Sequence, residues 1–119
     1  MVFDPYSFLE FAKEIHADKD YRKASAWRTI AGRAYYASFL SSRKKLQELG
    51  HSFAATPDVH KEVMAQVKTR NSGTANKLYM LRDSRNDADY NLMSLITSDQ
   101  CSKLLKLAEL VFQEVDSFK

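Results

Sequence analysis

Between Tyr21 and Leu49 the chain reads YRKASAWRTIAGRAYYASFLSSRKKLQEL. Apolar and small side chains recur in this stretch three or four positions apart, which places them on one face of an α-helix. The members of this face are Trp27, Ile30, Ala31, Ala34, Tyr35, Ser38, Phe39, Ser42, Leu46 and Leu49. The pattern predicts one long helix that ends at Gly50, with Tyr35 in the core. Gly32, inside this helix, indicates a place where a neighbouring helix packs closely.

Two shorter helices are predicted on either side of the long one. The first opens at Asp4-Pro5, because Asp caps helix N-termini and Pro is tolerated at the first helical position. Its apolar rhythm breaks at residues 17–20. A third helix starts near Pro57 and continues to about Thr69, followed by a turn at residues 70–73.

The last part of the chain predicts two further helices. Thr74 is the expected cap of a fourth helix, and Thr97 that of a fifth. The apolar face of the fourth helix is expected to hold Leu78, Leu81, Arg85, Ala88 and Leu92. We therefore expect an all-α fold: an antiparallel bundle of about five helices that forms a single domain over residues 1–119.

Length and composition agree with this fold class. The chain has 119 residues, of which 45% are hydrophobic and 28% charged, as in ordinary globular domains. It contains only three Gly and two Pro, and residues 74–119 contain neither. A small β-sandwich or barrel needs a turn about every 8 to 12 residues, so the composition argues against those folds and favours long helices.

Composition also limits the compartment and the chemistry. An acid at position 4 and the lack of a basic segment argue against a secretory signal, and no apolar run reaches the about 18 residues of a membrane span. We expect a cytoplasmic protein with no membrane contact. One Cys and three His are too few for a metal site, so we expect neither a metal nor another cofactor. The net charge of +3 is compatible with a nucleic-acid partner.

One group of polar residues lies on the predicted fourth helix. Arg85 falls on its apolar face, and Arg82, Asn86 and Asp89 lie three or four positions from it on the same side. Asn86 and Tyr90 form a second pair four positions apart. Such a cluster is a candidate phosphate-binding or catalytic site. The structural alternative is an intrahelical Arg85–Asp89 salt bridge on a solvated face.

Two further groups lie on other helices. Arg33 and Tyr36 can face the Arg85 helix together, and an aromatic ring beside a guanidinium suits RNA bases and phosphates. Amphipathic packing with an extended Arg is the alternative. His60 opens the third helix, and we interpret it as a supporting residue that hydrogen-bonds across to the Arg85 helix.

Four remaining features are assigned no function. His16 and His51 belong to no cluster, and we interpret both as surface residues. Cys101 lies among apolar neighbours and is interpreted as an inert core thiol. The basic run at residues 43–45 is interpreted as a solvated helix face.

Three motifs together resemble the HEPN superfamily, small α-helical domains of prokaryotic toxin–antitoxin and defence systems. The long helix carries RAYYASF at residues 33–39, the third opens with HK at residues 60–61, and the fourth carries RNDADY at residues 85–90. The similarity is to the small stand-alone members and covers nearly the whole chain.

The resemblance implies a helical bundle that often forms a homodimer. Catalytic members are metal-independent endoribonucleases whose motif is an Arg followed directly by a polar residue, with four to six residues between the Arg and a His. By this resemblance Arg85, Asn86 and Tyr90 take the catalytic positions, and Arg82, Asp89, Arg33 and Tyr36 are expected to bind RNA or nucleotide.

The sequence differs from that motif at Tyr90, which stands where a His is expected. A tyrosine hydroxyl is a poor general base at neutral pH, but it can donate a proton or bind phosphate. Two functions therefore stay open. One is a toxin or defence protein that cleaves RNA as a dimer; the other is a non-catalytic nucleotide- or RNA-binding or interaction module paired with a nucleotidyltransferase acting as antitoxin.

Overall fold

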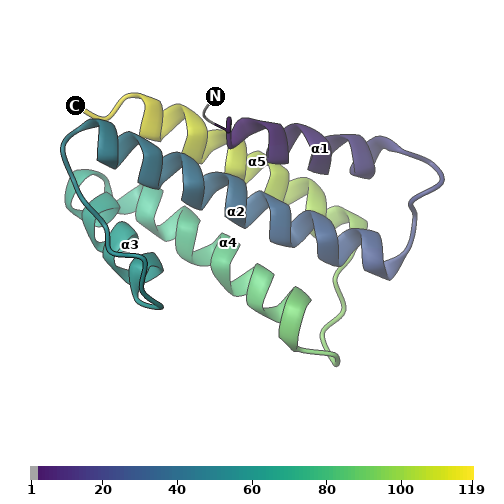
Figure 1. The fold of residues 1–119 in the computed structure, drawn as a ribbon. Coiled ribbons are helices and arrows are strands. Elements are labelled where there is room, and N and C mark those ends of the chain that lie inside the picture. The colour runs from purple at the N-terminus through teal and green to yellow at the C-terminus, as the bar shows by residue number, and fades with distance from the viewer. Residues whose placement is uncertain (1–2) are drawn as a thin grey trace.

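The computed structural model describes residues 3–119, and these form an all-α bundle (Figure 1). The helices are α1 (Tyr6–Ala17), α2 (Ala24–Glu48), α3 (Val59–Arg70), α4 (Ser72–Tyr90) and α5 (Ser98–Asp116). No strand occurs in this part of the chain. The expected fold class is confirmed, and the boundaries of α2, α3 and α5 agree with the sequence to within about three residues.

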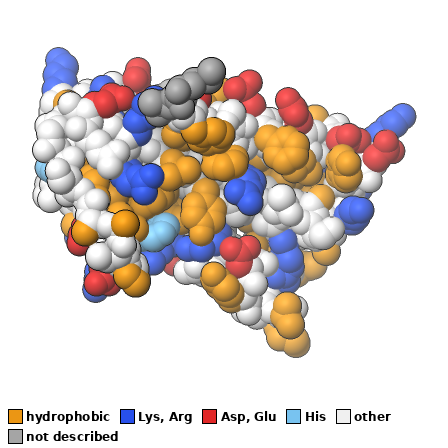
Figure 2. Space-filling view, viewed as in Figure 1, with side chains coloured by type: hydrophobic (Ala, Val, Ile, Leu, Met, Phe, Trp, Pro, Cys, Tyr) orange, Lys and Arg blue, Asp and Glu red, His pale blue; other side chains and the backbone are white. Residues whose placement is uncertain are grey.

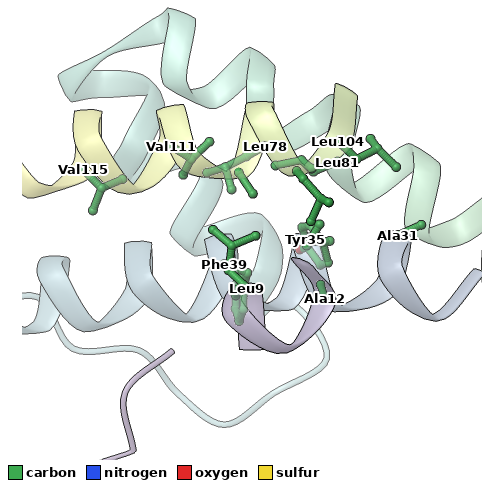
Figure 3. Packing of buried hydrophobic residues seen from close by; sticks show 14 of the residues in the cluster. Leu9, Ala12, Ala31, Tyr35, Phe39, Leu78, Leu81, Leu104, Val111 and Val115 are labelled. Carbon is green, nitrogen blue, oxygen red and sulfur yellow. The ribbon is translucent and has the colours of Figure 1, made fainter. Parts of the chain in front are cut away.

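The long helix α2 lies at the centre of the bundle and packs against all four other helices. Figure 1 shows α1 and α4 running along opposite sides of α2, with α5 behind it and the short α3 crossing near the C-terminal half of α2. Ile30, Ala34, Tyr35 and Leu46 on α2 are completely buried. Figure 3 shows Tyr35 and Phe39 of α2 between Leu9 of α1 and Leu78 and Leu81 of α4.

Helix α4 departs from the expectation at both ends. Its N-terminal cap is Asn71, whose Oδ1 accepts a hydrogen bond from the Thr74 backbone N–H at 3.1 Å. Thr74, the expected cap, is buried instead, and its hydroxyl donates to Glu114 at 2.6 Å. The helix ends at Tyr90, so Leu92 lies beyond it and is 88% exposed rather than buried.

Helix α5 begins as the sequence predicts. Thr97 accepts a hydrogen bond from the Gln100 backbone N–H at 3.1 Å, and the Gln100 side chain accepts from the Thr97 backbone at 2.9 Å. This reciprocal pair is a capping box. It fixes the start of α5 after the extended segment that follows α4.

Candidate functional site

Arg85 lies on the inner face of α4 and is only 7% exposed. Its Nη1 donates a hydrogen bond to the Tyr36 hydroxyl on α2 at 3.1 Å. The guanidinium carbon lies 5.1 Å and 5.2 Å from the ring centres of Tyr35 and Tyr36, within cation–π range. Arg85 therefore joins α4 to α2, and Tyr36 faces the Arg85 helix as the sequence predicts.

The Arg85–Asp89 pair on α4 is also present, but it is a loose contact. Arg85 Nη1 and Asp89 Oδ2 lie 4.0 Å apart, and the Asp89 side chain is 40% exposed. Only the Asp89 end of this pair is open to water, because the Arg85 side chain is buried, and 4.0 Å is the limit of a salt bridge. Another anion that takes the place of Asp89 would keep the buried guanidinium paired.

Two guanidinium nitrogens in this region lack hydrogen-bond partners. The Nε atoms of Arg82 and Arg85 are both buried, and neither finds an acceptor among residues 3–119. A buried donor without an acceptor costs about 1–3 kcal/mol, and more for a charged group. The two arginines therefore offer unsatisfied hydrogen-bonding capacity beside the aromatic pair of α2.

Tyr35 and His60 form a second polar contact behind this group. The Tyr35 hydroxyl lies 2.6 Å from Nδ1 of His60, and the His60 ring stacks on Phe39 with ring centres 4.1 Å apart. The sequence predicts a contact between His60 and the Arg85 helix; the hydrogen bond instead reaches α2. The reason is that Tyr35, although fully buried, points its hydroxyl toward the start of α3.

Burial sets the protonation of both partners. It raises the pKa of Tyr35 to about 12, so the hydroxyl keeps its proton at neutral pH. Burial, followed by the charges of Arg82, Arg85 and Arg43, lowers the pKa of His60 from its ordinary value. A protonated phenol beside a neutral imidazole makes Tyr35 the donor and Nδ1 of His60 the acceptor.

A small pocket of about 190 Å³ opens beside Tyr36. Its lining residues come from α2 and α4 and are Arg28, Thr29, Gly32, Arg33, Tyr36 and Asp89. The guanidinium of Arg33 lies 5.0 Å from the ring centre of Phe8 on α1. Arg33 thus shares the pocket with Tyr36, but its charged group leans toward α1 rather than toward Arg85.

Sequence reasoning missed the role of Arg28. Its guanidinium donates to four backbone carbonyl oxygens, those of Asp87, Ala88, Asn91 and Ser94, at distances between 2.7 Å and 3.2 Å. It therefore caps the C-terminus of α4, where carbonyl groups lack partners within the helix. No local pattern could reveal this, because the acceptors lie about 60 residues away in the chain.

The structure does not bring Asn86 and Tyr90 into the Arg85 cluster. Both are exposed, Tyr90 to 74%, and neither side chain makes a hydrogen bond to another described residue. Five positions along an α-helix correspond to about 140° of rotation beyond a full turn, so Arg85 and Tyr90 point to different sides. Within one chain the two residues do not form a catalytic pair.

Cys101, His16 and His51, to which the sequence assigns no function, differ in burial and in their contacts. Cys101 is buried as expected, and burial raises the pKa of its thiol to about 11. His16 is half-buried, and its Nε2 lies 3.1 Å from the Ser98 carbonyl oxygen and 3.2 Å from the Ser102 hydroxyl, joining α1 to α5. His51 is half-buried and lies 2.9 Å from an Arg70 nitrogen.

Two further features concern metals and membranes. In residues 3–119, no three His, Cys, Asp or Glu side chains gather closely enough to hold a metal ion. None of the helices described for this chain is both long and apolar enough to cross a bilayer.

Comparisons with known proteins add one relative. No protein-family model matches the chain. A protein of Methanocaldococcus jannaschii, named only as uncharacterized, is 31% identical over 110 residues. The match covers 78% of this chain and 66% of the length of the archaeal protein. Since that protein has no stated activity, the similarity carries no function over to this chain.

Proposed function

We propose that the protein binds RNA, or a free nucleotide, at the surface formed by Arg82, Arg85 and Tyr36, as an HEPN-type module. The observation that carries this proposal is the incomplete pairing of the Arg85 guanidinium, whose Nη1 has one hydrogen bond to Tyr36 and a carboxylate only at 4.0 Å, that of the partly exposed Asp89. A phosphate oxygen is a strong acceptor for a guanidinium, and it can bind two of its nitrogens at once. The Tyr36 side chain is half-buried, and a base could stack on its exposed part.

Binding at Arg85 requires one local change. Asp89 lies at the edge of the guanidinium and lines the neighbouring pocket. Because its contact with Arg85 is loose and its side chain partly exposed, an incoming phosphate can take its place. The exchange replaces one weak ion pair with a charge-assisted contact at Nη1 of Arg85.

The surrounding charge favours an anionic ligand. Arg33 lines the pocket, and Arg43, also on α2, adds a positive charge that lowers the pKa of His60. Figure 2 shows basic side chains distributed among hydrophobic ones over α2 and α4, with few acidic side chains between them. Aromatic rings interleaved with cations are typical of surfaces that bind single-stranded nucleic acid.

The resemblance to HEPN domains supports a biological setting for this binding. We place the protein in a toxin–antitoxin or defence system, as a homodimer in the cytoplasm. A nucleotidyltransferase that acts as antitoxin is the partner protein that the resemblance implies. This setting rests on the three sequence motifs.

A second candidate function is metal-independent cleavage of RNA by the dimer. The observation that favours it is the 74% exposure of Tyr90, which leaves its hydroxyl free to meet a second protomer. In this reaction the 2′-hydroxyl loses its proton to water as its oxygen bonds to the adjacent phosphorus, and Arg85 stabilises the charge on the phosphate oxygens. The bond from phosphorus to the 5′-oxygen breaks as Tyr90 protonates that oxygen, and Tyr90 then regains a proton from water. Asn86 is also exposed, and in this proposal it contacts the same strand.

One experiment tests both functions. Purified protein is incubated with a fluorescently labelled single-stranded RNA of about 20 nucleotides in the presence of EDTA, and anisotropy and product size are followed together. An anisotropy increase that weakens at higher salt is the expected result, because phosphate contacts release counterions. Shorter products in EDTA would add the cleavage function. If the anisotropy stays flat at every protein concentration with RNA and with a labelled nucleotide, the binding proposal is wrong.

A further inference from the structure

The pairing of His60 with Tyr35 places a titratable group directly behind the proposed phosphate site. His60 lies at the start of α3, while Tyr35 and the two arginines come from α2 and α4. The Tyr35 ring is in contact with His60 at its hydroxyl and with the Arg85 guanidinium at its face. One aromatic side chain thus separates the imidazole from the buried cation.

The charges that lower the pKa of His60 from α2 and α4 are those of three arginines, and Asp89 on α4 lies 4.0 Å from one of them, Arg85. Arg43 reaches it from α2, and Arg82 and Arg85 act on it from α4. The neutral groups beside it are Tyr35 and Phe39, both on α2. On α3 itself the neighbouring charges, Lys61 and Glu62, are exposed side chains of opposite sign.

We propose that His60 is a proton-linked part of the phosphate site: it is neutral when the site is empty and takes up a proton when an anion binds to Arg82 and Arg85. This inference rests on the proposed function and names a residue that regulates it. An anion at the two guanidinium groups offsets the positive charge that disfavours the imidazolium. In this proposal the anion does not contact His60; its negative charge acts on the imidazole electrostatically, across the Tyr35 ring.

Thermodynamic linkage gives the direction of the effect. Neighbouring cations and burial hold the pKa of His60 below its ordinary value in the free protein. If a bound anion raises that pKa, the complex holds more protons than the free protein between the two values. Affinity must then rise as the pH falls through this range, by a factor of ten for each unit that separates the two pKa values.

Protonation also changes the Tyr35–His60 hydrogen bond. In neutral His60, Nδ1 accepts a hydrogen bond from the Tyr35 hydroxyl. In the imidazolium, Nδ1 carries a proton and must donate the hydrogen bond instead. The hydroxyl then turns its proton away from His60. The Tyr35 ring packs against the Arg85 guanidinium. The side chain that hydrogen-bonds to His60 is therefore also in contact with the proposed anion site.

The test follows the His60 ring proton by NMR between pH 5 and 8.5. Sulfate is the probe, because it stays a dianion over this whole range and adds no titration of its own. One titration contains sulfate and the other chloride at matched ionic strength. His60→Gln assigns the resonance, and His16 and His51 serve as controls in the same spectra, since neither lies in the cluster.

We expect sulfate to move the His60 titration midpoint upward by about half a pH unit or more, equivalent to roughly threefold tighter binding at low pH. The curves of His16 and His51 should stay where they are. A His60 midpoint unchanged by both sulfate and a short RNA overturns the inference. Equal displacement of all three histidines also overturns it, because that result indicates a general salt effect.

RNA affinity gives a second readout that separates this inference from the proposed function. Wild-type protein should bind the labelled RNA at least threefold more tightly at pH 5.5 than at pH 8, beyond any change shown by His60→Gln. The Gln side chain can still accept the Tyr35 hydrogen bond but cannot titrate. RNA binding with the same pH dependence in both proteins leaves the proposed function intact and removes the role of His60. Absence of RNA binding at every pH removes the proposed function itself.

Discussion

The charged side chain of Arg85 is buried, and a buried charge needs hydrogen-bond or ion-pair partners. It is 7% exposed, yet its described contacts are one hydrogen bond to Tyr36, two aromatic rings and a carboxylate 4.0 Å away. A charge that serves only packing is usually better paired, because an incompletely satisfied guanidinium in the interior is costly. Each such group in a native structure requires an explanation, and a role in a functional site is one of them.

Replacing Arg85 with Ala tests that interpretation directly. Arg85→Ala should weaken RNA binding by on the order of 1.5–3 kcal/mol, the scale of a hydrogen bond to a charged group. The matched control is Lys103→Ala, which removes one positive charge from an exposed position on α5. Anisotropy titrations measure both affinities, and circular dichroism confirms that each variant is folded. If Arg85→Ala only lowers the melting temperature and binds RNA normally, Arg85 is a structural residue.

Tyr90 separates binding from cleavage. Its hydroxyl makes no hydrogen bond to another described residue, so Tyr90→Phe should leave both the stability and the RNA affinity within experimental error of wild type. Any cleavage in EDTA should fall sharply, because the variant has lost the proton donor. Gel electrophoresis of the labelled RNA measures this. Undiminished cleavage by Tyr90→Phe would exclude the residue from the chemistry.

At the level of the helices, α2 contains a glycine that the packing does not require. A Cβ built on Gly32 meets only Asp89 Oδ1, at 3.9 Å, an ordinary van der Waals distance. Gly32→Ala should therefore raise the free energy of unfolding by about 0.5–1 kcal/mol, because alanine favours the helix. Urea denaturation gives the value. A loss of stability would mean that α4 approaches α2 more closely than 3.9 Å implies.

Arg28 gives a prediction for the end of α4. Arg28→Lys keeps the charge but loses the planar group that reaches four carbonyl oxygens. We expect faster amide hydrogen exchange at residues 88–94 and unchanged exchange in α5. Mass spectrometry of peptic fragments reports both regions. Equal protection in the variant would show that Arg28 does not hold this segment.

The helices themselves follow from local sequence, whereas the contacts between them do not. The 3.6-residue rhythm of residues 21–49 and the Thr97 cap predict α2 and the start of α5. The capping of α4 by Arg28 and the meeting of His60 with Tyr35 depend on residues 60 and 25 positions apart. The 3.6-residue spacing of apolar residues predicts Leu92 on the buried face of α4. The backbone of Asn91 is extended, however, so the helix ends before Leu92. The sequence therefore predicts that Tyr36 and Arg85 face each other, because each lies on a recognisable helix face. It does not predict the contacts made at the helix ends by Arg28 and His60.

At the scale of the whole molecule, the separation of Arg85 from Tyr90 bears on the oligomeric state. Arg85 faces the interior between α4 and α2, while Tyr90 projects from the end of α4. One chain cannot place both on the same phosphate. If the protein cleaves RNA with these residues, a second copy must supply one of them, which agrees with the homodimer implied by the resemblance.

We therefore expect a homodimer that brings the two Arg85 residues to a shared cleft, with a mass of about twice the 13.7 kDa of the chain. Multi-angle light scattering at micromolar concentration measures it, and mixing inactive Arg85→Ala with inactive Tyr90→Phe tests whether the site is shared. If one protomer's Tyr90 acts on phosphate held by the partner's Arg85, heterodimers keep one intact site and recover part of the cleavage. A single species of 13.7 kDa would exclude the shared site. RNA binding by that monomer would leave Arg85, Arg82 and Tyr36 as a binding surface complete within one chain.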